Sequence, residues 1–479
     1  MSIAKNYIYN VVYQVFILIV PLITIPYVSK VLGSHGVGVN AYTNSIIQYF
    51  ILFGTIGVAL YGNRSIAYVR DNKEKLSQTF WSIFFLKLMT TSIAYVCFLV
   101  FLLFVHRFNF IFLIQSIYII SAAVDVTWLY MGLEDFKKTV LRNLIVKVIG
   151  TICIFVFIQT KNDLWEYVLI LSLSELFGQM TMWFYIPKTV EKIKIKWHAI
   201  KVHFLPALVL FLPQVSIQIY AVLNKSMLGK LSNPSEVGFF DNADKIVKVI
   251  LALVTAMGVV MLPRISNTFA KGDTAKVREY LFQSLDFASY LSIPLMFGMA
   301  AIARNFTAWY FPPEFSKTGL LIAIISPIIV FIAWSNVLGI QFLMPVGKMR
   351  EFTISVTIGA IINFIVNLIL IHAYQSVGTA ISTVIAEFTV TFVQFCFTVK
   401  DINLKELGKS LWKYVFSGLI MYIAVLFVEK LFRFGILLTM MQVIIGVIVY
   451  FAILFALHSE LNKKVFIKGL HLLRVTGRN

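Results

Sequence analysis

The chain has 479 residues, of which 59% are hydrophobic and only 13% are charged, and its mean hydropathy is +0.86. A soluble protein keeps about a quarter of its residues charged, so this composition excludes an ordinary soluble enzyme and indicates a protein folded in a lipid bilayer. The net charge is +19, but the basic residues lie in short loops between apolar blocks and form no polar domain. We therefore expect no nucleic-acid partner.

Apolar blocks of roughly 20 residues recur along the whole chain and predict an all-α polytopic membrane protein. The first block contains Pro21 and Pro26 and is followed by no small-residue cleavage site, so we expect a retained helix and not a removed signal peptide. The predicted spans, about fourteen in number, lie near 8–31, 39–61, 80–105, 110–131, 142–160, 165–187, 204–229, 238–262, 283–306, 318–345, 351–372, 377–400, 412–430 and 437–457.

The basic residues predict the orientation of these spans. Of the 41 Lys and Arg residues, 28 lie in the two termini and in alternate loops, seven lie in the other loops, and six fall within spans. Short loops rich in Lys and Arg stay on the cytoplasmic side of a membrane, so we expect both termini in the cytoplasm.

Two segments of the second half echo segments of the first. Gly38 opens GVNAYTNSIIQ in the second predicted span, and Gly238 opens GFFDNADKIVK in the eighth. A second echo pairs Glu175 in SLSELF with Glu387 in VIAEFT. Together the echoes favour a repeat plan common in transporters. The predicted parts are two pseudo-symmetric six-helix lobes at 1–200 and 201–403, and a helix pair with a cytoplasmic tail at 404–479.

The eighth predicted span carries four charges on one helical stripe. Asp241, Asp244, Lys245 and Lys248 are spaced i, i+3, i+4 and i+7, and they form two i, i+4 pairs with the acid on the N-terminal side. One charge at the bilayer centre costs at least about 2.5–3.5 kcal/mol, so the stripe must face protein or a water-filled cavity. Two interpretations are open: the pairs neutralise each other in a helix interface, or the lysines line a cavity and bind an anionic substrate.

The second predicted span offers a matching polar stripe. Asn40, Asn44 and Gln48 lie at i, i+4 and i+8. Two lobes that each present a polar stripe would enclose a hydrophilic central cavity, which favours the second interpretation.

Other polar residues inside the spans are, taken singly, more typical of helix packing than of ligand binding. They are Gln14, Lys87, Asp125, Lys147, Gln214, Gln218, Asn336, Gln341, Asn363 and Asn367. Glu387 is the leading candidate for proton or ion coupling, followed by Glu175, Asn363 and Asn367, although a hydrogen bond to a neighbouring helix explains Glu387 equally well. The sequence has no catalytic constellation, metal-binding histidine pair or phosphate-binding glycine loop.

One segment resembles a family signature. DVTWLYMGLEDFKKTVLRNLIVK, residues 125–147, is similar to a signature of the bacterial oligosaccharide flippases of the Wzx type, which handle O-antigen and capsule repeat units. The matching residues are Asp125, Trp128, Gly132, Glu134, Phe136, Arg142, Asn143 and Lys147. The segments PYVSKVLGSHGVG, GNRSIAYVRD, ADKIVKVI, VMLPRIS and WSNVLGIQFLMPVGK also resemble this family, so the similarity covers nearly the whole chain.

The resemblance implies the fold of the multidrug/oligosaccharidyl-lipid/polysaccharide (MOP) exporters, in which two MATE-like lobes alternate between inward-open and outward-open states. It implies a substrate, an oligosaccharide on undecaprenyl diphosphate that moves from the inner to the outer leaflet of the bacterial cytoplasmic membrane. It also implies partners, a polysaccharide polymerase and glycosyltransferases of the same pathway. No cofactor is implied beyond a proton or sodium gradient or the membrane potential.

In this superfamily, cationic cavity residues are thought to receive the diphosphate. The leading candidates here are Lys245 and Lys248, with their partners Asp241 and Asp244. The further cavity candidates are Lys147, Arg64, Lys225, Gln14, Asn40, Asn44 and Gln48. Lys225 stands in NKSMLG, where the family often has an Asp and this chain has Asn224.

Three alternatives remain. A multidrug cation antiporter of the same superfamily usually carries a carboxylate in its first span, and residues 6–29 contain none. A lipid II flippase is expected to be richer in arginine, whereas the first Arg here is Arg64. A membrane glycosyltransferase or polymerase, which would be an enzyme, tends to have a large extracytoplasmic loop, and every predicted loop here is short.

Overall fold

The computed structural model describes residues 3–255, 258–432 and 434–463, and this part of the chain is helical and contains no β-strand. The structure does not describe the side chains of residues 3–18, 136–138, 141, 212–214, 216–217, 220–221, 258–260 and 431. Contacts divide the chain into two compact units, Met1–Gly238 (unit 1) and Phe239–Asn479 (unit 2). The lobe boundaries predicted at 200/201 and 403/404 stay a prediction.

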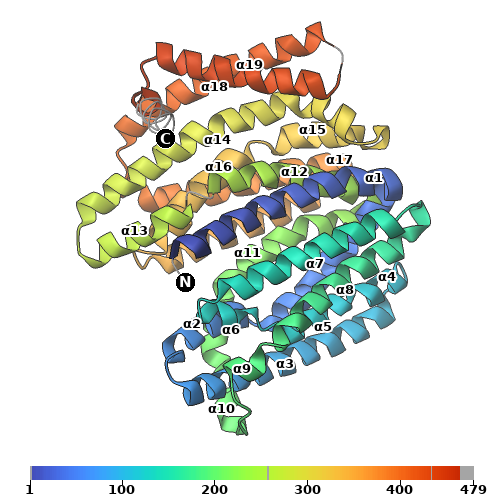
Figure 1. The fold of residues 1–479 in the computed structure, drawn as a ribbon. Helices are drawn as coiled ribbons and strands as arrows, with labels where there is room; N and C mark the ends of the chain where they lie inside the picture. The colour runs from blue at the N-terminus through green and yellow to red at the C-terminus, as the bar shows by residue number, and fades with distance from the viewer. Residues whose placement is uncertain (1–2, 256–257, 433, 464–479) are drawn as a thin grey trace, which may run out of the picture. The chain divides into compact units, whose positions relative to one another are not determined.

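Unit 1 is built of long helices joined by short turns (Figure 1). They are α1 (Ile3–Thr55), α2 (Val58–Val69), α3 (Lys73–Phe104), α4 (Asn109–Gln115), α5 (Ile117–Val124), α6 (Thr127–Gly132), α7 (Phe136–Phe157), the 3₁₀ turn η1 (Lys161–Asp163), α8 (Leu164–Trp183), α9 (Ile186–Thr189), α10 (Trp197–Lys201) and α11 (Phe204–Leu231). Helix α12 (Pro234–Thr255) begins in unit 1 and continues into unit 2.

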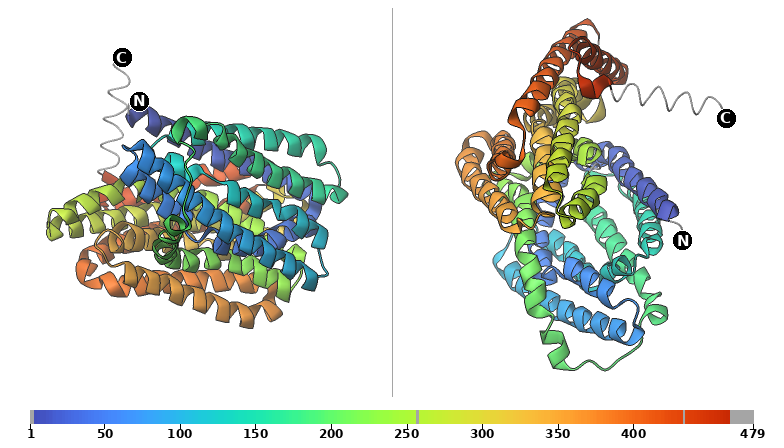
Figure 2. Two further views of the ribbon diagram at one scale, coloured as in Figure 1. Left: turned by 90° about the horizontal axis from the view of Figure 1, so that it is seen from below. Right: turned by 90° about the vertical axis from the view of Figure 1, so that its left-hand side faces the viewer.

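Unit 2 is also built of helices joined by turns. Its elements are α13 (Gly258–Ala270), α14 (Thr274–Tyr310), the 3₁₀ turn η2 (Pro313–Phe315), α15 (Ser316–Ile325), α16 (Ile328–Ser335), the π-helical turn η3 (Asn336–Leu343), α17 (Met349–Thr398), the 3₁₀ turn η4 (Val399–Asp401), α18 (Leu404–Leu431) and α19 (Ile436–Ala456). Helices α18 and α19 pack against each other and against α14, as Figure 2 also shows.

The helices confirm the predicted fold class, a multi-span all-α membrane protein. Eight helices in the described ranges are long and apolar enough to cross a membrane, or nine if the bent pair Pro313–Ile325 and Ile328–Leu343 counts as one span. Met349–Asp401 contains the predicted spans 351–372 and 377–400, and Ile19–Val69 contains the predicted span 39–61 and the second part of 8–31. The predicted number of fourteen is not confirmed.

Each of these two segments contains a residue with left-handed backbone geometry. In α1, Gly33 has φ 67° and ψ 177°, a conformation that is open to glycine because it has no Cβ. In α17 the corresponding residue is Gln375, with φ 51°. These breaks fall between the predicted spans, so α1 and α17 are each two helices that meet at a kink where a loop is predicted.

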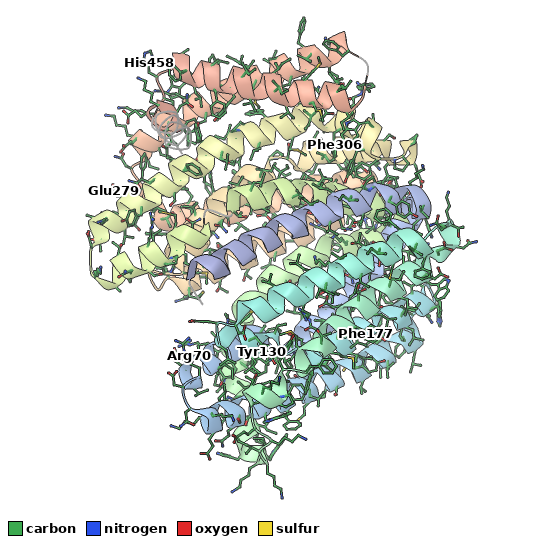
Figure 3. All side chains as sticks on the ribbon, in the orientation of Figure 1. Arg70, Tyr130, Phe177, Glu279, Phe306 and His458 are labelled. Carbon is green, nitrogen blue, oxygen red and sulfur yellow. The ribbon has the colours of Figure 1, made fainter. Side chains whose placement is uncertain are left out.

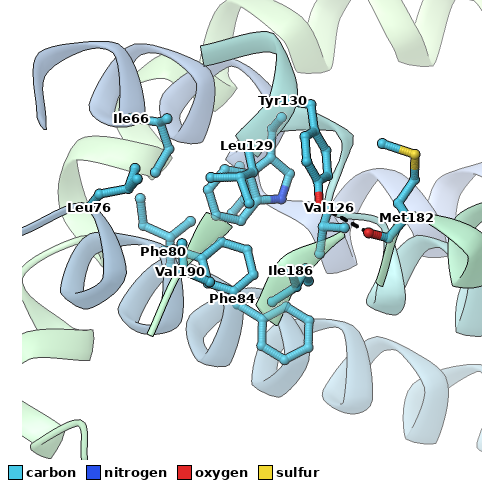
Figure 4. Packing of buried hydrophobic residues seen from close by; sticks show 13 residues of the cluster. Ile66, Leu76, Phe80, Phe84, Val126, Leu129, Tyr130, Met182, Ile186 and Val190 are labelled. Atoms are coloured by element: carbon cyan, nitrogen blue, oxygen red, sulfur yellow. Dashed lines mark hydrogen bonds between the residues drawn. The ribbon is translucent and has the colours of Figure 1, made fainter. Parts of the chain in front are cut away.

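An aromatic core holds α2, α3, α6 and α8 of unit 1 together (Figure 4). Phe80 stacks on the ring of Trp128 at a centroid distance of 5.5 Å, and both side chains are buried. The hydroxyl of Tyr130 donates a hydrogen bond of 3.0 Å to the carbonyl oxygen of Met182. Tyrosine is suited to this position because its ring fills the core while its hydroxyl satisfies a backbone oxygen.

The outward faces of many helices are apolar. Phe177 on α8 and Phe306 on α14 are labelled in Figure 3, and Phe177 is exposed. Large exposed side chains such as Leu103, Ile423 and Leu437 occur on α3, α18 and α19. Exposed apolar surface of this extent is unfavourable in water but is stable against lipid, which supports placement of these helices in a membrane.

The two glycines that open the first sequence echo lie against each other's segments within unit 1. A Cβ atom on Gly38 would lie 1.6 Å from the carbonyl oxygen of Pro234, and one on Gly238 would lie 2.4 Å from the carbonyl oxygen of Ser34. The contacts are reciprocal, because Pro234 and Ser34 stand in the same register as the two glycines. Backbone atoms cannot move aside as a side chain can, so both positions require glycine.

We expect Gly38→Ala and Gly238→Ala each to destabilise the protein by about 1–3 kcal/mol or more, because the new methyl group forces two backbones apart. The matched control is Gly408→Ala on α18, where an added Cβ meets nothing within 4 Å. The control should be neutral or slightly stabilising, since Ala is the better helix former. Thermal unfolding of the purified variants tests this, and equal melting temperatures for all three would contradict it.

Candidate functional site

The charged stripe of the eighth predicted span lies in a single helix, α12, as its spacing predicts. The helix begins just after Asn233, whose side-chain oxygen accepts a hydrogen bond of 3.1 Å from the backbone N–H of Glu236 and so acts as an N-terminal cap. The carboxylate of Asp241 lies 2.6 Å from the ammonium of Lys245, and that of Asp244 lies 2.8 Å from the ammonium of Lys248.

The two partners of each pair differ in burial. The side chains of Asp241 and Asp244 are 3% and 7% exposed, whereas those of Lys245 and Lys248 are 42% and 49% exposed. The carboxylates are therefore withdrawn into the protein, and the accessible ends of the stripe are the two ammonium groups. A stripe that is neutral by count thus offers an anion two hydrogen-bond donors with positive charge.

Unit 1 contains a separate polar cavity of about 360 Å³. Its wall comes from three helices and the residue that follows α5: Gln48, Ile51 and Thr55 from α1, Tyr118, Ser121 and Ala122 from α5, Glu175 and Gln179 from α8, and Asp125. We call it the unit 1 cavity. Three of its residues, Gln48, Asp125 and Glu175, are polar residues that the sequence analysis places inside spans.

Asp125 organises the break between α5 and α6. Its carboxylate accepts hydrogen bonds from the backbone N–H (2.9 Å) and the hydroxyl (2.6 Å) of Thr127, which begins α6. The ammonium of Lys87, on α3, lies 3.3 Å from the same carboxylate and donates to the backbone carbonyl of Asp125 at 2.8 Å. The indole N–H of Trp128 donates to that carbonyl as well. The Asp125 side chain thus binds Thr127 and Lys87, while Trp128 uses only the backbone of residue 125.

The rest of the signature segment also has structural roles. Gly132 allows α6 to approach α2, because a Cβ there would lie 2.7 Å from the carbonyl oxygen of Asn63. Glu134 forms an ion pair of 2.9 Å with Arg70, at the position labelled in Figure 3. The first contact joins α6 to the middle of α2, and the second joins the turn after α6 to the residue that follows α2.

A hydrogen-bonded chain connects α7 with the wall of the unit 1 cavity. The guanidinium of Arg142 donates to the side-chain oxygen of Gln179 at 2.7 Å and to the side-chain oxygen of Asn143. Gln179 in turn donates to the carboxylate of Glu175 at 2.8 Å. Lys147 interacts electrostatically with the same carboxylate. The structure therefore brings the predicted residues Lys147 and Glu175 together.

The residues of the polar stripe of α1, Asn40, Asn44 and Gln48, lie in different environments. The buried side chain of Gln115 donates to the side-chain oxygen of Asn40 at 3.0 Å, so Asn40 takes part in packing between α1 and α4. Gln48 lines the unit 1 cavity. Asn44 is half-buried and has no side-chain hydrogen bond within the described residues, and the side chain of Gln14 lies outside them.

The other predicted site residues lie elsewhere. Arg64 is exposed on α2, where its guanidinium donates to the hydroxyl of Tyr68 at 3.1 Å. Lys225 is half-buried on α11. On α17, Asn367 donates to the side-chain oxygen of Asn363 at 3.1 Å, and Ser382 donates to the carbonyl oxygen of Asn363 at 3.0 Å, so these amides join the two stretches of α17. Glu387 is buried on the second stretch.

A larger cavity of about 1,100 Å³ in unit 2 was not anticipated from the sequence. It lies between α14 and α18 and the residues after α19. Its wall carries both signs of charge, with Lys405, Lys409 and Lys413 alongside Glu279, Asp286, Glu406 and Glu460. The mixture gives no preference for a ligand of one charge.

Three further residues were not predicted as site residues: Gln179 and Ser121, which line the unit 1 cavity, and Arg142, which donates to Gln179. The signature segment contained Arg142, and the i, i+4 spacing of Glu175 and Gln179 indicates that they share a face of one helix. No pattern in the sequence places α7 against α8. Ser121 carries no sequence signal at all.

We expect Lys87→Met to destabilise the protein by about 3 kcal/mol or more, because the carboxylate of Asp125 would remain without its buried cation. The double variant Lys87→Met with Asp125→Asn should recover most of this loss, since the unpaired charge is then absent. Thermal unfolding of the single and double variants measures the coupling. Simple additivity of the two single changes would show that the pair does not act as a unit.

Residues 3–269 match the family described as polysaccharide biosynthesis protein. The chain is 24% identical over 406 residues to the "Putative O-antigen transporter" of Escherichia coli (strain K12), which covers 83% of this chain and 97% of that protein. The relatives of known name are transporters and flippases, not enzymes, in agreement with the predicted class.

Solved structures show the fold. The lipid II flippase MurJ in its inward-closed conformation superposes with a TM-score of 0.68 at 17% identity, covering 97% of this chain and all of that one. An inward-facing MATE family transporter of the MOP superfamily has a TM-score of 0.64 at 13% identity, covering 85% and 96%. The predicted MOP-type fold is thereby confirmed. The chain belongs to the polysaccharide biosynthesis protein family.

Proposed function

We propose that this protein is a flippase that moves an oligosaccharide linked to undecaprenyl diphosphate from the inner to the outer leaflet of a bacterial cytoplasmic membrane. Membership of the polysaccharide biosynthesis family, the O-antigen transporter among its relatives and the flippase-type fold support a polysaccharide flippase in general. The lipid carrier, the direction and the orientation with both termini in the cytoplasm are part of the proposal.

The observation that carries the proposal is the geometry of α12. Its carboxylates are buried and its two ammonium groups are accessible within a helix of a transport fold. A diphosphate is the anionic part of the proposed substrate, and paired ammonium groups can donate hydrogen bonds to its oxygens while they balance its charge. Lys245 and Lys248 are therefore the proposed diphosphate-binding residues, supported at these positions by Asp241 and Asp244.

The other cationic candidates suit this role less well. Lys147 interacts with Glu175, so its charge is already balanced in part. Arg64 is exposed beside Tyr68 on α2. Lys225 is half-buried on α11 and already has a partner.

Elementary energetics make the proposed task reasonable. A sugar headgroup cannot cross hydrocarbon unaided, because each unsatisfied polar group there costs several kcal/mol, whereas the polyprenyl tail can remain in the lipid. Outward movement of negative charge is favoured by an inside-negative potential by roughly 2.3 kcal/mol per charge per 100 mV. The membrane potential can therefore contribute to driving the cycle. Glycosyltransferases that build the repeat unit and a polymerase that consumes it are the proposed partners.

The double variant Lys245→Ala with Lys248→Ala should reduce surface polysaccharide at least tenfold while the protein still inserts into the membrane, because the diphosphate loses both cationic contacts. Lys245→Arg with Lys248→Arg is the matched control and should retain much of the export, since the charge remains. Polysaccharide on the cell surface and protein in the membrane are measured in the same cells. Normal export by the alanine pair at normal protein levels would overturn the assignment.

Removal of the lysines alone leaves two buried carboxylates without their ion-pair partners, which can itself impair folding. A second variant therefore removes both charges of each pair, with Asp241→Asn and Asp244→Asn added to the two alanine substitutions. This variant should fold and still fail to export. Restored export would show that the lysines serve only their own aspartates.

We further propose that Glu387 couples transport to a proton or sodium gradient. Its side chain is buried on α17, where a change in protonation would alter the packing of the helix. Glu387→Gln should abolish the response of transport to an imposed gradient in vesicles. The control is Glu279→Gln, at the exposed start of α14 (Figure 3). An unchanged response in the Glu387 variant would remove the coupling role.

A further inference from the structure

The unit 1 cavity contains polar groups that lack partners. Ser121 is only 2% exposed, and its hydroxyl oxygen is buried without a hydrogen bond. The side chains of Gln48 and Tyr118, in the same wall, make no hydrogen bond within the described residues either. A buried polar group without a partner costs about 1–3 kcal/mol, so the Ser121 hydroxyl favours a ligand or a water that supplies the missing bond. The half-buried side chains of Gln48 and Tyr118 offer further hydrogen-bonding groups in the same wall.

The charges around this cavity are arranged in the opposite sense to those of α12. The groups that line it are the carboxylates of Asp125 and Glu175 and neutral amides and hydroxyls. Among the described residues, neither Lys87 nor Lys147 lines the cavity. Lys87 forms an ion pair with Asp125, and Lys147 is near enough to Glu175 to interact with it electrostatically.

This lining discriminates between the two parts of the proposed substrate. A diphosphate would face carboxylates here with no lining cation, which is repulsive. A sugar hydroxyl can donate to a carboxylate and accept from an amide N–H or a hydroxyl, and the wall offers all three groups. Tyr118 and Ile51 supply apolar surface for the carbon faces of a sugar ring. The volume of about 360 Å³ lies within the usual range for small-molecule sites.

From this chemistry we infer that the unit 1 cavity binds uncharged, hydroxyl-rich sugar residues of the substrate, with Ser121 and Gln48 as specificity-determining residues. The inference rests on the proposed function and assigns the sugar to a site other than the paired lysines of α12. A site built to hydrogen-bond a substrate hydroxyl rejects an analogue without it more strongly than an apolar pocket rejects a small change of shape. The cavity would therefore set which repeat units the protein accepts.

The test variant is Ser121→Ala with Gln48→Leu. Because the Ser121 hydroxyl has no partner, its removal should leave the melting temperature unchanged or raise it. Ser82→Ala is the matched control: its hydroxyl is also buried without a hydrogen bond, in α3 of the same unit, but it does not line the cavity. The control should have the same effect on stability and none on binding.

Binding is measured for the full chain in lipid nanodiscs with two kinds of probe. One is undecaprenyl diphosphate, and the other is a panel of undecaprenyl diphosphates that carry a single hexose or N-acetylhexosamine. Wild-type protein should bind at least one sugar-bearing probe more tightly than the bare lipid. The test variant should lose this preference by about two- to tenfold for each hydrogen bond removed and keep its affinity for the bare lipid.

The outcomes separate this inference from the proposed function. Lys245→Ala with Lys248→Ala should weaken binding of both probes by the same factor, so their ratio should stay that of the wild type. An unchanged ratio in the Ser121 and Gln48 variant, or a wild type that prefers no sugar in the panel, would overturn the sugar site while the flippase proposal stands. Loss of sugar preference in the lysine variant alone would place sugar recognition on α12 and would also overturn the inference. If no probe binds the wild type at all, the proposed function itself fails, and the sugar site with it.

Discussion

The cost of placing a charge in an apolar span governs this structure. Lys87 is almost fully buried in α3, and it is stabilised there by the carboxylate and the backbone carbonyl of Asp125. That pairing fixes the residue at which α5 ends, and the carboxylate of Asp125 then caps α6 through Thr127. Trp128 donates to the same carbonyl and stacks on Phe80, so the ion pair and the aromatic core of unit 1 meet at this break.

The two units stabilise their charged side chains in different ways, so they expose groups of different charge. In unit 1 the carboxylates of Asp125 and Glu175 line a cavity, and Lys87 and Lys147, which interact with them, are not among its described lining residues. On α12 the carboxylates are buried and the ammonium groups are accessible. A substrate with an anionic diphosphate and neutral sugars contains one part for each of these surfaces. Local pairing of acids with bases is thus compatible with two distinct binding preferences.

The sequence predicted what periodicity and composition determine. The helical stripe of α12 and both of its ion pairs follow from i, i+4 spacing, because the partners lie on one helix. The partner of Asn40 did not follow, since Gln115 stands on another helix and periodicity gives a face but not its neighbour. The hydrogen bond from Arg142 to Gln179 did not follow for the same reason, because it joins α7 to α8, whereas Gln179 and Glu175 are i, i+4 neighbours on α8. Arg64 was proposed from a resemblance, and its exposed position depends on how α2 packs.

In the sequence echo between the two halves, the glycines serve helix packing, and polar residues that follow them belong to the proposed binding sites. Gly38 and Gly238 share one reciprocal contact, in which each must lack a Cβ atom because the other's segment places a backbone oxygen there. Nothing in that contact constrains the residues that follow. In the shared register, neutral Asn44 and Gln48 stand where α12 has Asp244 and Lys248. The close approach of the two backbones requires both glycines. The polar stripes that follow them can differ in charge, and two sites for different parts of one ligand would need such a difference.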